Sequence, residues 1–371
     1  MNNHTPYKRY HRQVLLKEFG EKSQQKLLQA KVLVAGAGGL GCAAMQYLAA
    51  GGVGTIGIVD DDVVSLSNLH RQVLYTTNDI GSSKAERAAY SLQQLNPEVD
   101  IIAYNKRLTT ANCLEMIAAF DIVIDGTDNF STRYMINDAC VLLNKPLVYG
   151  AISKFEGQVA VLNYQSGKGT IPVNYRDLFP QPPDDNEILN CAEAGVLGVL
   201  PGIIGIMQAN ETIKLIAGIG KPLIDHLLTY DALTNQVYKL ALTPADGTRS
   251  LIPKDAAAFK ATQYDRFCSS SVDTQFEIGI EELEQLAASG NIDIIDVREL
   301  GEEPLITRFS NKQIPLSQLK KQLTVFENDT IITFCQSGKR SLQAARYLFE
   351  TFGSSKRIYS LRGGIMNLQK E

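Results

Sequence analysis

Short hydrophobic runs alternate with longer segments of mixed polarity along residues 31–149. The runs are typical of buried strands, and the segments between them carry apolar positions at helical spacing. The predicted strands are residues 31–35, a second ending on Asp60, 100–104, 121–125 and 146–149, and the predicted helices are about 40–50, 85–95, 111–119 and 132–144. Strands that alternate with helices predict a Rossmann-like α/β fold with helices on both faces of the sheet.

The pattern changes after Glu156. Shorter strand-like pieces, GQVAVLNY and HLLTYDALTNQVYKLAL, follow the alternating series, so the sheet is expected to be mixed. A loop rich in Pro and Asp at residues 170–190 lies between them and precedes a predicted buried helix at 202–217. Ahead of the first strand, residues 5–30 are predicted to form an amphipathic helix.

A second alternating unit begins near Phe276, after a stretch at 244–272 that lacks apolar periodicity and is typical of a linker. Its predicted elements are helix 280–288, strand 292–297, strand 330–334, helix 341–351 and strand 357–361. A chain of 371 residues has room for two domains. The expected division is a first domain at 1–245, a linker at 246–272 and a smaller α/β domain at 273–371.

Composition narrows the class of protein. The chain is 44% hydrophobic and 20% charged, with a formal net charge of -4, which does not favour a nucleic-acid binder. The polar N-terminus lacks the apolar core of a signal peptide, and the longest apolar run, around 196–207, is too short to cross a membrane. We therefore expect a cytoplasmic protein with no nucleic-acid or membrane partner.

Six scattered cysteines form no C-x-x-C pair. This pattern argues against a disulfide framework and against a structural zinc site, so no zinc is expected.

The glycine turn after the first strand is the strongest local signal in the first domain. Gly36, Gly38 and Gly41 match G-x-G-x-x-G, and a helix is predicted to begin there. Glycines let the backbone approach a phosphate chain, and the helix N-terminus attracts its negative charge. Asp60, about 20 residues on, is suited to holding a ribose hydroxyl. The ligand is thus an adenine nucleotide, either NAD or ATP.

Polar residues near the turn favour ATP. Asn68, Arg71, Gln72 and Lys84 are donors suited to phosphate charge. Asp128 follows a later strand, where a carboxylate can hold Mg2+ bridging phosphates. Since strand carboxyl ends share one sheet edge, this set is suited to attack of a substrate carboxylate on the α-phosphate of ATP. An NAD-dependent oxidoreductase stays open as an alternative.

Several motifs in order resemble the MoeB/ThiF group of ubiquitin-activating-type adenylyltransferases. They are GAGGLG, IVDDDVVSLSNLHRQ, GSSKAE, DGTDN, GAISKFEGQV and CAEAGVLG, and the resemblance covers about residues 5–240. It implies ATP-dependent activation of the C-terminal glycine of a ubiquitin-like sulfur carrier protein ending in Gly-Gly. The nucleotide-binding residues that it implies are Gly38, Gly39, Gly41, Asp60, Asn68, Arg71, Gln72, Lys84, Asp128 and Asn129, with Asp128 as the magnesium ligand and catalytic aspartate.

The resemblance also assigns two residues outside this set. Arg12, in RYHRQ, matches an arginine that family members insert into the partner subunit's site, which implies a homodimer. Cys191, in LNCAEAGV, matches a crossover-loop cysteine that some members bond covalently to the carrier, and a plain buried cysteine is the equal alternative. The chain departs from its relatives in lacking their C-x-x-C zinc ligands.

The second domain carries its own candidate chemistry in FCQSGKRS. Cys335 follows a predicted strand and precedes a predicted helix, so it would lie in a ring of backbone N–H groups beside Arg340. Such a ring cradles an anion, and its small size suits a sulfur atom better than a phosphate. The alternative is a buried cysteine at a strand end.

This segment resembles the active loop of rhodanese sulfurtransferases, and IIDVRE resembles their signature strand. The resemblance covers about residues 275–371 and implies that Cys335 carries a persulfide stabilised by Arg340. The stretch ITRFSN at 306–311 departs from the G-H-I-P-G-A of rhodaneses. The expected architecture is therefore a Rossmann-like adenylation domain with a mixed sheet, followed by a small α/β rhodanese domain.

Together the two sites predict a two-step sulfur activator. The carrier would be adenylated by Mg·ATP, and a Cys335 persulfide, loaded by a donor such as a cysteine desulfurase, would convert it to a thiocarboxylate. A non-catalytic scaffold that binds a ubiquitin-fold partner is the second alternative. The sequence does not choose among molybdopterin, thiamine and tRNA thiolation as the recipient pathway.

Overall fold

The computed structural model describes residues 7–165, 167, 169–182, 195–264, 275–288, 290–319, 322–323 and 326–368. The chain divides into two compact units, 1–268 and 269–371. Each unit has a sheet and a hydrophobic core of its own.

The first unit is built on an eight-stranded sheet in the order β3-β2-β1-β4-β5-β6-β7-β8. The strands are β1 (Lys31–Ala35), β2 (Thr55–Val59), β3 (Asp100–Tyr104), β4 (Ile122–Asp125), β5 (Leu147–Ser153), β6 (Glu156–Leu162), β7 (His226–Asp231) and β8 (Gln236–Ala241). The first five in this order are parallel, and β6, β7 and β8 are joined antiparallel. The expected mixed sheet of a Rossmann-like fold is confirmed.

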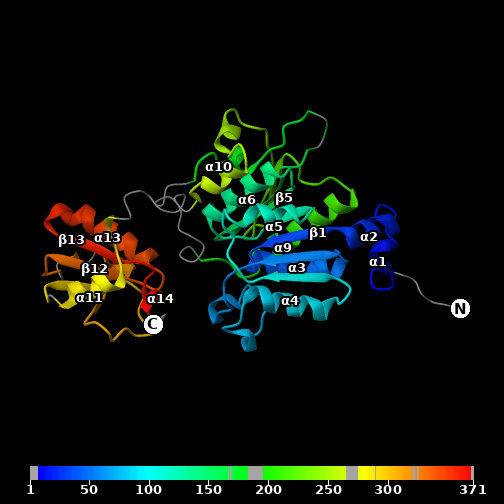
Figure 1. Ribbon diagram of the computed structural model, residues 1–371. Helices are drawn as coiled ribbons and strands as arrows, with labels where there is room; N and C mark the ends of the chain where they lie inside the picture. The colour runs from blue at the N-terminus through cyan, green and yellow to red at the C-terminus, as the bar shows by residue number, and fades with distance from the viewer. Residues whose placement is uncertain are drawn as a thin grey trace. The chain divides into compact units, whose positions relative to one another are not determined.

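Helices cover both faces of this sheet (Figure 1). They are α1 (His11–Val14), α2 (Gly20–Gln29), α3 (Gly39–Gly51), α4 (Lys84–Leu95), α5 (Cys113–Ala118), α6 (Phe130–Leu142), α7 (Tyr175–Leu178), α9 (Leu200–Ala217) and α10 (Ala256–Ala261), with single turns η1 (Leu66–Asn68), η2 (Thr77–Asp79) and η3 (Thr248–Leu251). Alternate residues of β1 enter the two cores, Val32 and Val34 on the α3 and α9 face and Leu33 on the α5 and α6 face.

The N-terminal segment differs from the single helix expected at 5–30. It forms the short α1 and then α2, which begins at Gly20 with a φ of 62°. The chain turns there because Phe19 enters the core while Gln13 bonds back to the last residue of α3, with its Nε2 2.9 Å from Gly51 O. Local periodicity does not report such a contact.

The segment expected to be a linker also contains structure. Residues 248–251 form η3, residues 256–261 form α10, and Phe259 is fully buried against the α6 face of the sheet. Tyr264 is buried as well and donates its hydroxyl hydrogen to Asp138 Oδ2 at 2.8 Å. The first unit thus includes the chain as far as Tyr264.

The second unit has a five-stranded parallel sheet in the order β11-β10-β12-β13-β9. Its elements are β9 (Glu277–Ile278), α11 (Ile280–Ala288), β10 (Ile292–Asp296), β11 (Lys312–Gln313), α12 (Leu316–Leu319), β12 (Thr330–Phe334), α13 (Lys339–Phe352), η7 (Gly353–Ser355), β13 (Arg357–Leu361) and α14 (Ile365–Leu368). The central strand β12 is buried along its whole length and leads into the Cys335 loop.

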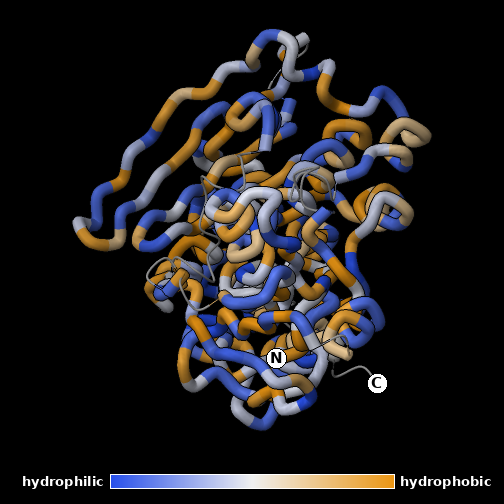
Figure 2. The backbone as a smooth tube through the Cα atoms, turned by 90° about the vertical axis from the view of Figure 1, so that its left-hand side faces the viewer, coloured by the Kyte–Doolittle hydropathy of each residue, from blue (hydrophilic) through white to orange (hydrophobic). Residues whose placement is uncertain are grey.

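Hydrophobic stretches are short and interleaved with hydrophilic ones along the coloured part of the trace (Figure 2). In the described ranges no helix combines the length and the hydropathy that crossing a membrane requires.

Candidate functional sites

The strand order of the first unit reverses between β1 and β4, which creates a switch point at the carboxyl edge of the sheet. In register, Ala35 pairs with Val59 on one side and with Asp125 on the other. The residues that follow these three strand ends therefore gather at one edge. They include the glycine turn, Asp60 and the turn that carries Asp128.

Close backbone approach explains the glycines of the turn. A Cβ on Gly41 would lie 2.0 Å from Gly36 O, and a Cβ on Gly36, whose φ is 94°, would lie 2.7 Å from Gly126 O. Gly39 has the same constraint toward α9, with Pro201 Cβ at 2.8 Å. At Gly38, the N-cap of α3, the nearest described atom to a Cβ is Gln72 Nε2 at 3.8 Å.

Asp60 joins the glycine turn to the next loop. Its Oδ2 accepts the Ala37 N–H at 2.7 Å and its Oδ1 accepts the Asp62 N–H at 2.8 Å. Burial raises the pKa of Asp60 above its ordinary value, against the lowering effect of the two N–H donors. Each carboxylate oxygen keeps further acceptor capacity, so the position suits a ribose hydroxyl.

The four polar residues predicted after Asp60 lie on the segment that joins β2 to α4 and at the start of α4. They are Asn68, Arg71, Gln72 and Lys84. Lys84 is the first residue of α4, nearly buried, and its Nζ lies 2.9 Å from Asp62 Oδ2. Arg71 Nη1 lies 2.7 Å from the ring nitrogen Nε2 of His70 and donates to Ser67 O at 3.2 Å. The carbonyl of Asn68 accepts the N–H groups of residues 71 and 72.

Gln72 has an orphaned polar atom. The side chain is buried, and its Oε1 has no hydrogen-bond partner in the described part of the chain. A buried amide oxygen without a donor is costly. Its place beside Gly38 is therefore consistent with a polar ligand that donates to it.

The turn after β4 is held by a buried ion pair that sequence reasoning missed. Asp125 Oδ1 accepts both the N–H of Thr127, at 2.9 Å, and its hydroxyl, at 2.6 Å. Arg133 of α6 donates its Nε to Asp125 Oδ2 at 3.0 Å and its Nη2 to Thr127 O at 2.7 Å. Asp128 stands next on this fixed turn and is exposed, while Asn129 caps α6 by accepting the Thr132 N–H.

Gln208 of α9 fixes the same turn from the other face of the sheet. Its Nε2 donates to Asp125 O at 2.7 Å and to Val148 O at 3.1 Å, so it joins the carboxyl end of β4 to the second residue of β5. A sequence signal existed for the pair but not for Gln208. Asp125 ends a wholly apolar strand and Arg133 is the one cation of α6, whereas a glutamine in a helix is unremarkable.

Two predicted residues do not join this cluster. Arg12 is exposed on α1, beside Gln13, which contacts the last residue of α3. The glycine turn lies at the opposite end of α3, around its first residue. The 13 residues of α3 span about 20 Å, at ~1.5 Å for each residue. Arg12 is thus far from its own chain's turn. Cys191 lies outside the described residues.

Three other cysteines are poor nucleophiles. Burial raises the pKa of Cys42 and of Cys113 to about 12, and that of Cys140 well above its ordinary value. They stay protonated at neutral pH and pack in the cores. Over the described ranges, no group of three or more His, Cys, Asp or Glu side chains is arranged to hold a metal ion.

Cys335 of the second unit lies directly after β12 and just before α13. The side chain is buried, and its Sγ accepts the Ser341 N–H at 3.4 Å. Three buried hydroxyls hold Ser341 in place: Thr333 donates to Ser341 O at 2.7 Å, Ser360 donates to Ser341 Oγ at 2.8 Å, and Ser341 Oγ donates to Gly338 O at 2.9 Å. Cys335 thus lies between a buried strand and a helix N-terminus, where one backbone N–H contacts its sulfur.

Gly338 and Gly364, which the sequence analysis did not single out, allow the Cys335 loop to pack closely against the turn after β13. A Cβ on Gly364 would lie 2.2 Å from Cys335 O, and a Cβ on Gly338 would lie 2.8 Å from Gly363 N. Gly338 and Gly364 both have positive φ. The signal was present as Arg-Gly-Gly after the last strand, a common mark of a tight turn.

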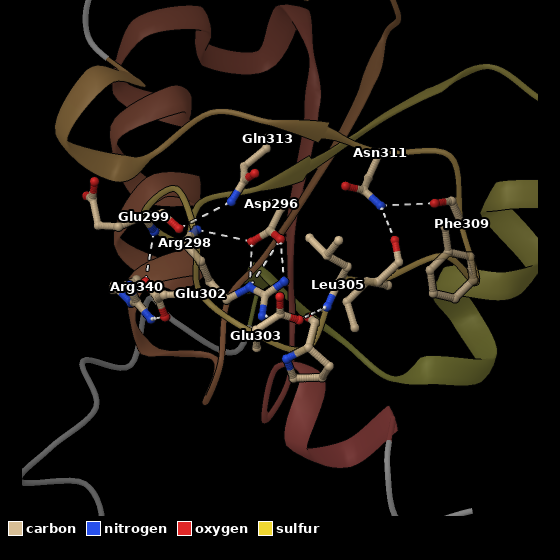
Figure 3. A network of polar contacts seen from close by, with 12 residues as sticks. Asp296, Arg298, Glu299, Glu302, Glu303, Leu305, Phe309, Asn311, Gln313 and Arg340 are labelled. Atoms are coloured by element: carbon tan, nitrogen blue, oxygen red, sulfur yellow. Dashed lines mark hydrogen bonds and ion pairs between the residues drawn. The ribbon is translucent and has the colours of Figure 1, made fainter. Parts of the chain in front are cut away.

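Arg340 is paired with an acidic side chain of its own domain. Its Nη1 and Nη2 lie 2.5 and 2.8 Å from the two carboxylate oxygens of Glu302 (Figure 3). The Arg340 hydrogen bonds lower the pKa of Glu302 below its ordinary value. In the 306–311 stretch, which departs from rhodaneses, Asn311 Nδ2 closes the loop on Ile306 O and Phe309 O.

Comparison with known proteins gives the same division. Residues 10–250 match the ThiF family, and residues 279–371 match the rhodanese-like domain. A sulfur carrier protein adenylyltransferase of Thermus thermophilus is 53% identical over 234 residues, covering 63% of this chain and 86% of that protein. The adenylyltransferase and sulfurtransferase MOCS3 of Aedes aegypti is 37% identical over 369 residues, covering 94% of this chain and 83% of that protein.

Among solved structures, MccB of E. coli with ATP aligns with a TM-score of 0.57 at 21% identity. The alignment covers 66% of this chain and 74% of that chain, and at this identity it shows a common fold. The names of these relatives favour neither an oxidoreductase nor a non-catalytic scaffold.

Proposed function

Because the chain belongs to the ThiF family and continues into a rhodanese-like domain, we propose that it activates a ubiquitin-like sulfur carrier protein and then sulfurates it. The observation that carries the proposal is the pair of sites on one chain. One is a nucleotide-type glycine turn with cations beside it, and the other is a cysteine at a helix N-terminus whose sulfur accepts a backbone N–H.

In the first step ATP is a substrate. Gly38, Gly39 and Gly41 and the start of α3 would receive its phosphates, and Asp60 would accept its ribose hydroxyls. An oxygen of the carrier's terminal carboxylate attacks the α-phosphorus, and pyrophosphate leaves with the electron pair of the broken P–O bond. The product is an acyl-adenylate.

Cations would offset the charge that develops in this step. Lys84 would exchange Asp62 for phosphate oxygens, and Arg71 would leave His70 for the same purpose. Asn68, Gln72 and Asn129 complete the polar lining in the proposal. Gln72 fits especially well, because its orphaned Oε1 would gain a donor.

Asp128 is the residue that would hold Mg2+. Its carboxylate is exposed on a turn that Asp125 and Arg133 fix, which suits a hard cation shared with phosphate oxygens. A bound magnesium ion would neutralise phosphate charge there.

The position of Arg12 supports a homodimer in the proposal. Arg12 lies about 20 Å of helix away from its own glycine turn, farther than its side chain extends, so it would act in a second copy of the chain. Leu15 and Leu16, both exposed beside it, supply apolar surface of the kind that interfaces bury.

In the second step the outer sulfur of a Cys335 persulfide attacks the acyl carbon, and AMP leaves. A thiol then attacks the resulting acyl disulfide at the Cys335 sulfur, which frees the carrier thiocarboxylate. The sulfur would come from a persulfide donor such as a cysteine desulfurase. Cys191 is proposed as an optional covalent carrier site between the steps.

The test of the first step is ATP–pyrophosphate exchange with a panel of carriers ending in Gly-Gly. We expect exchange with at least one carrier, and loss of more than about 100-fold in Asp128→Asn, the scale of a lost charge stabiliser. Carriers of the molybdopterin, thiamine and tRNA thiolation pathways should be compared in parallel. Absence of exchange with every carrier of the same organism contradicts the proposal.

Cys335→Ala separates the two steps. It should abolish thiocarboxylate formation, measured by the mass of the carrier, and leave exchange unchanged. A parallel fall in exchange would show that the two sites do not divide the work as proposed.

A further inference from the structure

The Arg340 guanidinium, which belongs to the Cys335 loop, is engaged by a carboxylate rather than presented bare. Both terminal nitrogens contact Glu302, at 2.5 and 2.8 Å, in a fork-to-fork arrangement (Figure 3). This is the strongest geometry for an arginine–carboxylate pair. An oxyanion arriving at the loop would use the same edge of the guanidinium.

Glu302 is itself held in place by a short turn. Its Oε1 also accepts the Glu299 N–H at 2.8 Å, which closes the turn at one end. At the other end Arg298 donates Nη1 to Pro304 O at 3.0 Å. Arg298 is fully buried and pairs with Asp296, so the base of the turn is fixed to β10. The carboxylate is thus a built feature of the loop.

Exposed apolar residues stand beside the acidic ones in this turn. Leu300 and Leu305, on either side of Glu302, are 70% and 67% exposed. Met366, whose N–H bonds to Gln336 O in the Cys335 loop, is 50% exposed. A loop whose arginine already holds a carboxylate is poorly suited to a small dianion.

Two classes of sulfur donor give the same Cys335 persulfide, but the donors and their leaving groups differ in charge. With thiosulfate, the Cys335 thiolate attacks the outer sulfur, the S–S bond breaks, and sulfite leaves as a dianion. With an alkyl persulfide R–S–SH, the same attack releases R–S–, which takes the persulfide proton. Both transfers move one zero-valent sulfur without external redox, but only the first needs cationic stabilisation of a dianionic donor and product.

We propose that Glu302 sets the sulfur-donor specificity of Cys335: by occupying Arg340 it disfavours thiosulfate and leaves the loop suited to persulfide donors. The inference rests on the proposed sulfurtransferase function of the second domain. It assigns a role to Glu302 that acts through Arg340, so Glu302 is a specificity-determining residue and not a catalytic one.

The test uses the full-length protein in single-turnover sulfuration of Cys335. Thiosulfate or glutathione persulfide is mixed in excess, and the gain of one sulfur atom is followed by intact mass, with Cys335→Ala as the blank. Glu302→Gln should raise the rate with thiosulfate about tenfold, which is the effect expected from removing one partly exposed charge beside the reacting anion. It should change the rate with the persulfide less than about threefold.

Two further variants make the result specific. Glu299→Gln removes an exposed carboxylate from the same turn and keeps the backbone N–H that Glu302 accepts, so it should leave the ratio of the two rates as in the wild type. Glu302→Gln combined with Arg340→Gln should lose the thiosulfate gain, because the uncovered guanidinium produces it.

The outcomes are distinct. An unchanged rate ratio in Glu302→Gln, or an equal loss with both donors, overturns the inference and leaves Glu302 a structural residue. Glu302→Ala, which also uncovers Arg340, should repeat the shift if the glutamine variant folds poorly. A wild-type protein that gains sulfur from neither donor would instead contradict the sulfurtransferase proposal.

Discussion

In the described part of the chain two buried aspartate–arginine pairs involve α6, and one of them holds a loop of the proposed nucleotide site. Arg133 Nε lies 3.0 Å from Asp125 Oδ2 and also bonds to the turn that carries Asp128. Asp138 of the same helix lies 2.7 Å from Arg176 Nη2, in a network with Tyr264 away from that turn. Breaking either pair leaves an uncompensated buried charge.

The two pairs therefore allow a matched test of the turn. Arg133→Gln and Arg176→Gln should each lower the free energy of unfolding by about 3–5 kcal/mol, as for other broken buried pairs. Only Arg133→Gln should also raise the KM for ATP in the exchange assay, by about tenfold or more, since Asp128 then loses its fixed turn. Denaturant unfolding and exchange kinetics measure the two effects. Equal changes in KM would contradict this role of Arg133.

Among single residues, the sequence indicated polar or reactive side chains that directly follow a buried strand. Asp60 and Cys335 could be found because each follows a buried strand, where ligands of such sheets bind. Glu302 and Gln208 could not, because their partners lie 38 and 83 residues away. Such pairings depend on strand register and helix packing, which local patterns do not report.

At the scale of elements, the contact between α3 and α9 places the glycine turn. A Cβ on Gly205 of α9 would lie 2.2 Å from Leu40 O, whereas a Cβ on Gly202, one turn earlier, would meet nothing within 4 Å. The two glycines of α9 thus differ in whether a side chain would fit at their position. Gly205 permits close helix packing, and Gly202 only adds conformational freedom to the unfolded chain.

Alanine substitutions should separate these roles. Gly205→Ala should destabilise the protein by about 1–3 kcal/mol through overpacking, and raise the KM for ATP as α3 is displaced. Gly202→Ala should stabilise it by about 0.5 kcal/mol, with unchanged kinetics. Thermal and denaturant unfolding give the stability terms. Similar effects from both substitutions would show that helix contact at Gly205 is looser than the geometry indicates.

Hydrophobic periodicity predicted most helices and strands, but it did not predict elements whose position depends on the contacts of a few residues. Helix 280–288 and strands 330–334 and 357–361 were predicted with the bounds that the structure has. The break between α1 and α2 was missed, since it depends on a contact of Gln13 with a distant helix. In α10 only Phe259 is buried, so its six residues show no helical stripe.

At the scale of the whole molecule, the proposed dimer predicts complementation between two inactive variants. Arg12→Ala lacks the residue given to the other copy, and Asp128→Asn lacks a residue of its own site. In a one-to-one mixture that reassorts freely, about one quarter of the sites would be complete. ATP–pyrophosphate exchange should recover to roughly that fraction of wild type.

A nearby arginine provides the control. Arg9 bonds to Leu95 O of its own chain at 3.2 Å, so Arg9→Ala should keep exchange close to wild type. Failure of the Arg12 and Asp128 variants to complement each other would place Arg12 outside the partner's site.

The burial of Phe259 and Tyr264 determines how the protein can be dissected into fragments. A first fragment cut at residue 245 would lose the aromatic pair from its core and would leave Asp138 without the Tyr264 hydroxyl. Such a fragment would expose apolar surface and be prone to aggregate. A fragment extended through residue 264 keeps both contacts, so expression of the separate halves calls for a cut beyond Tyr264.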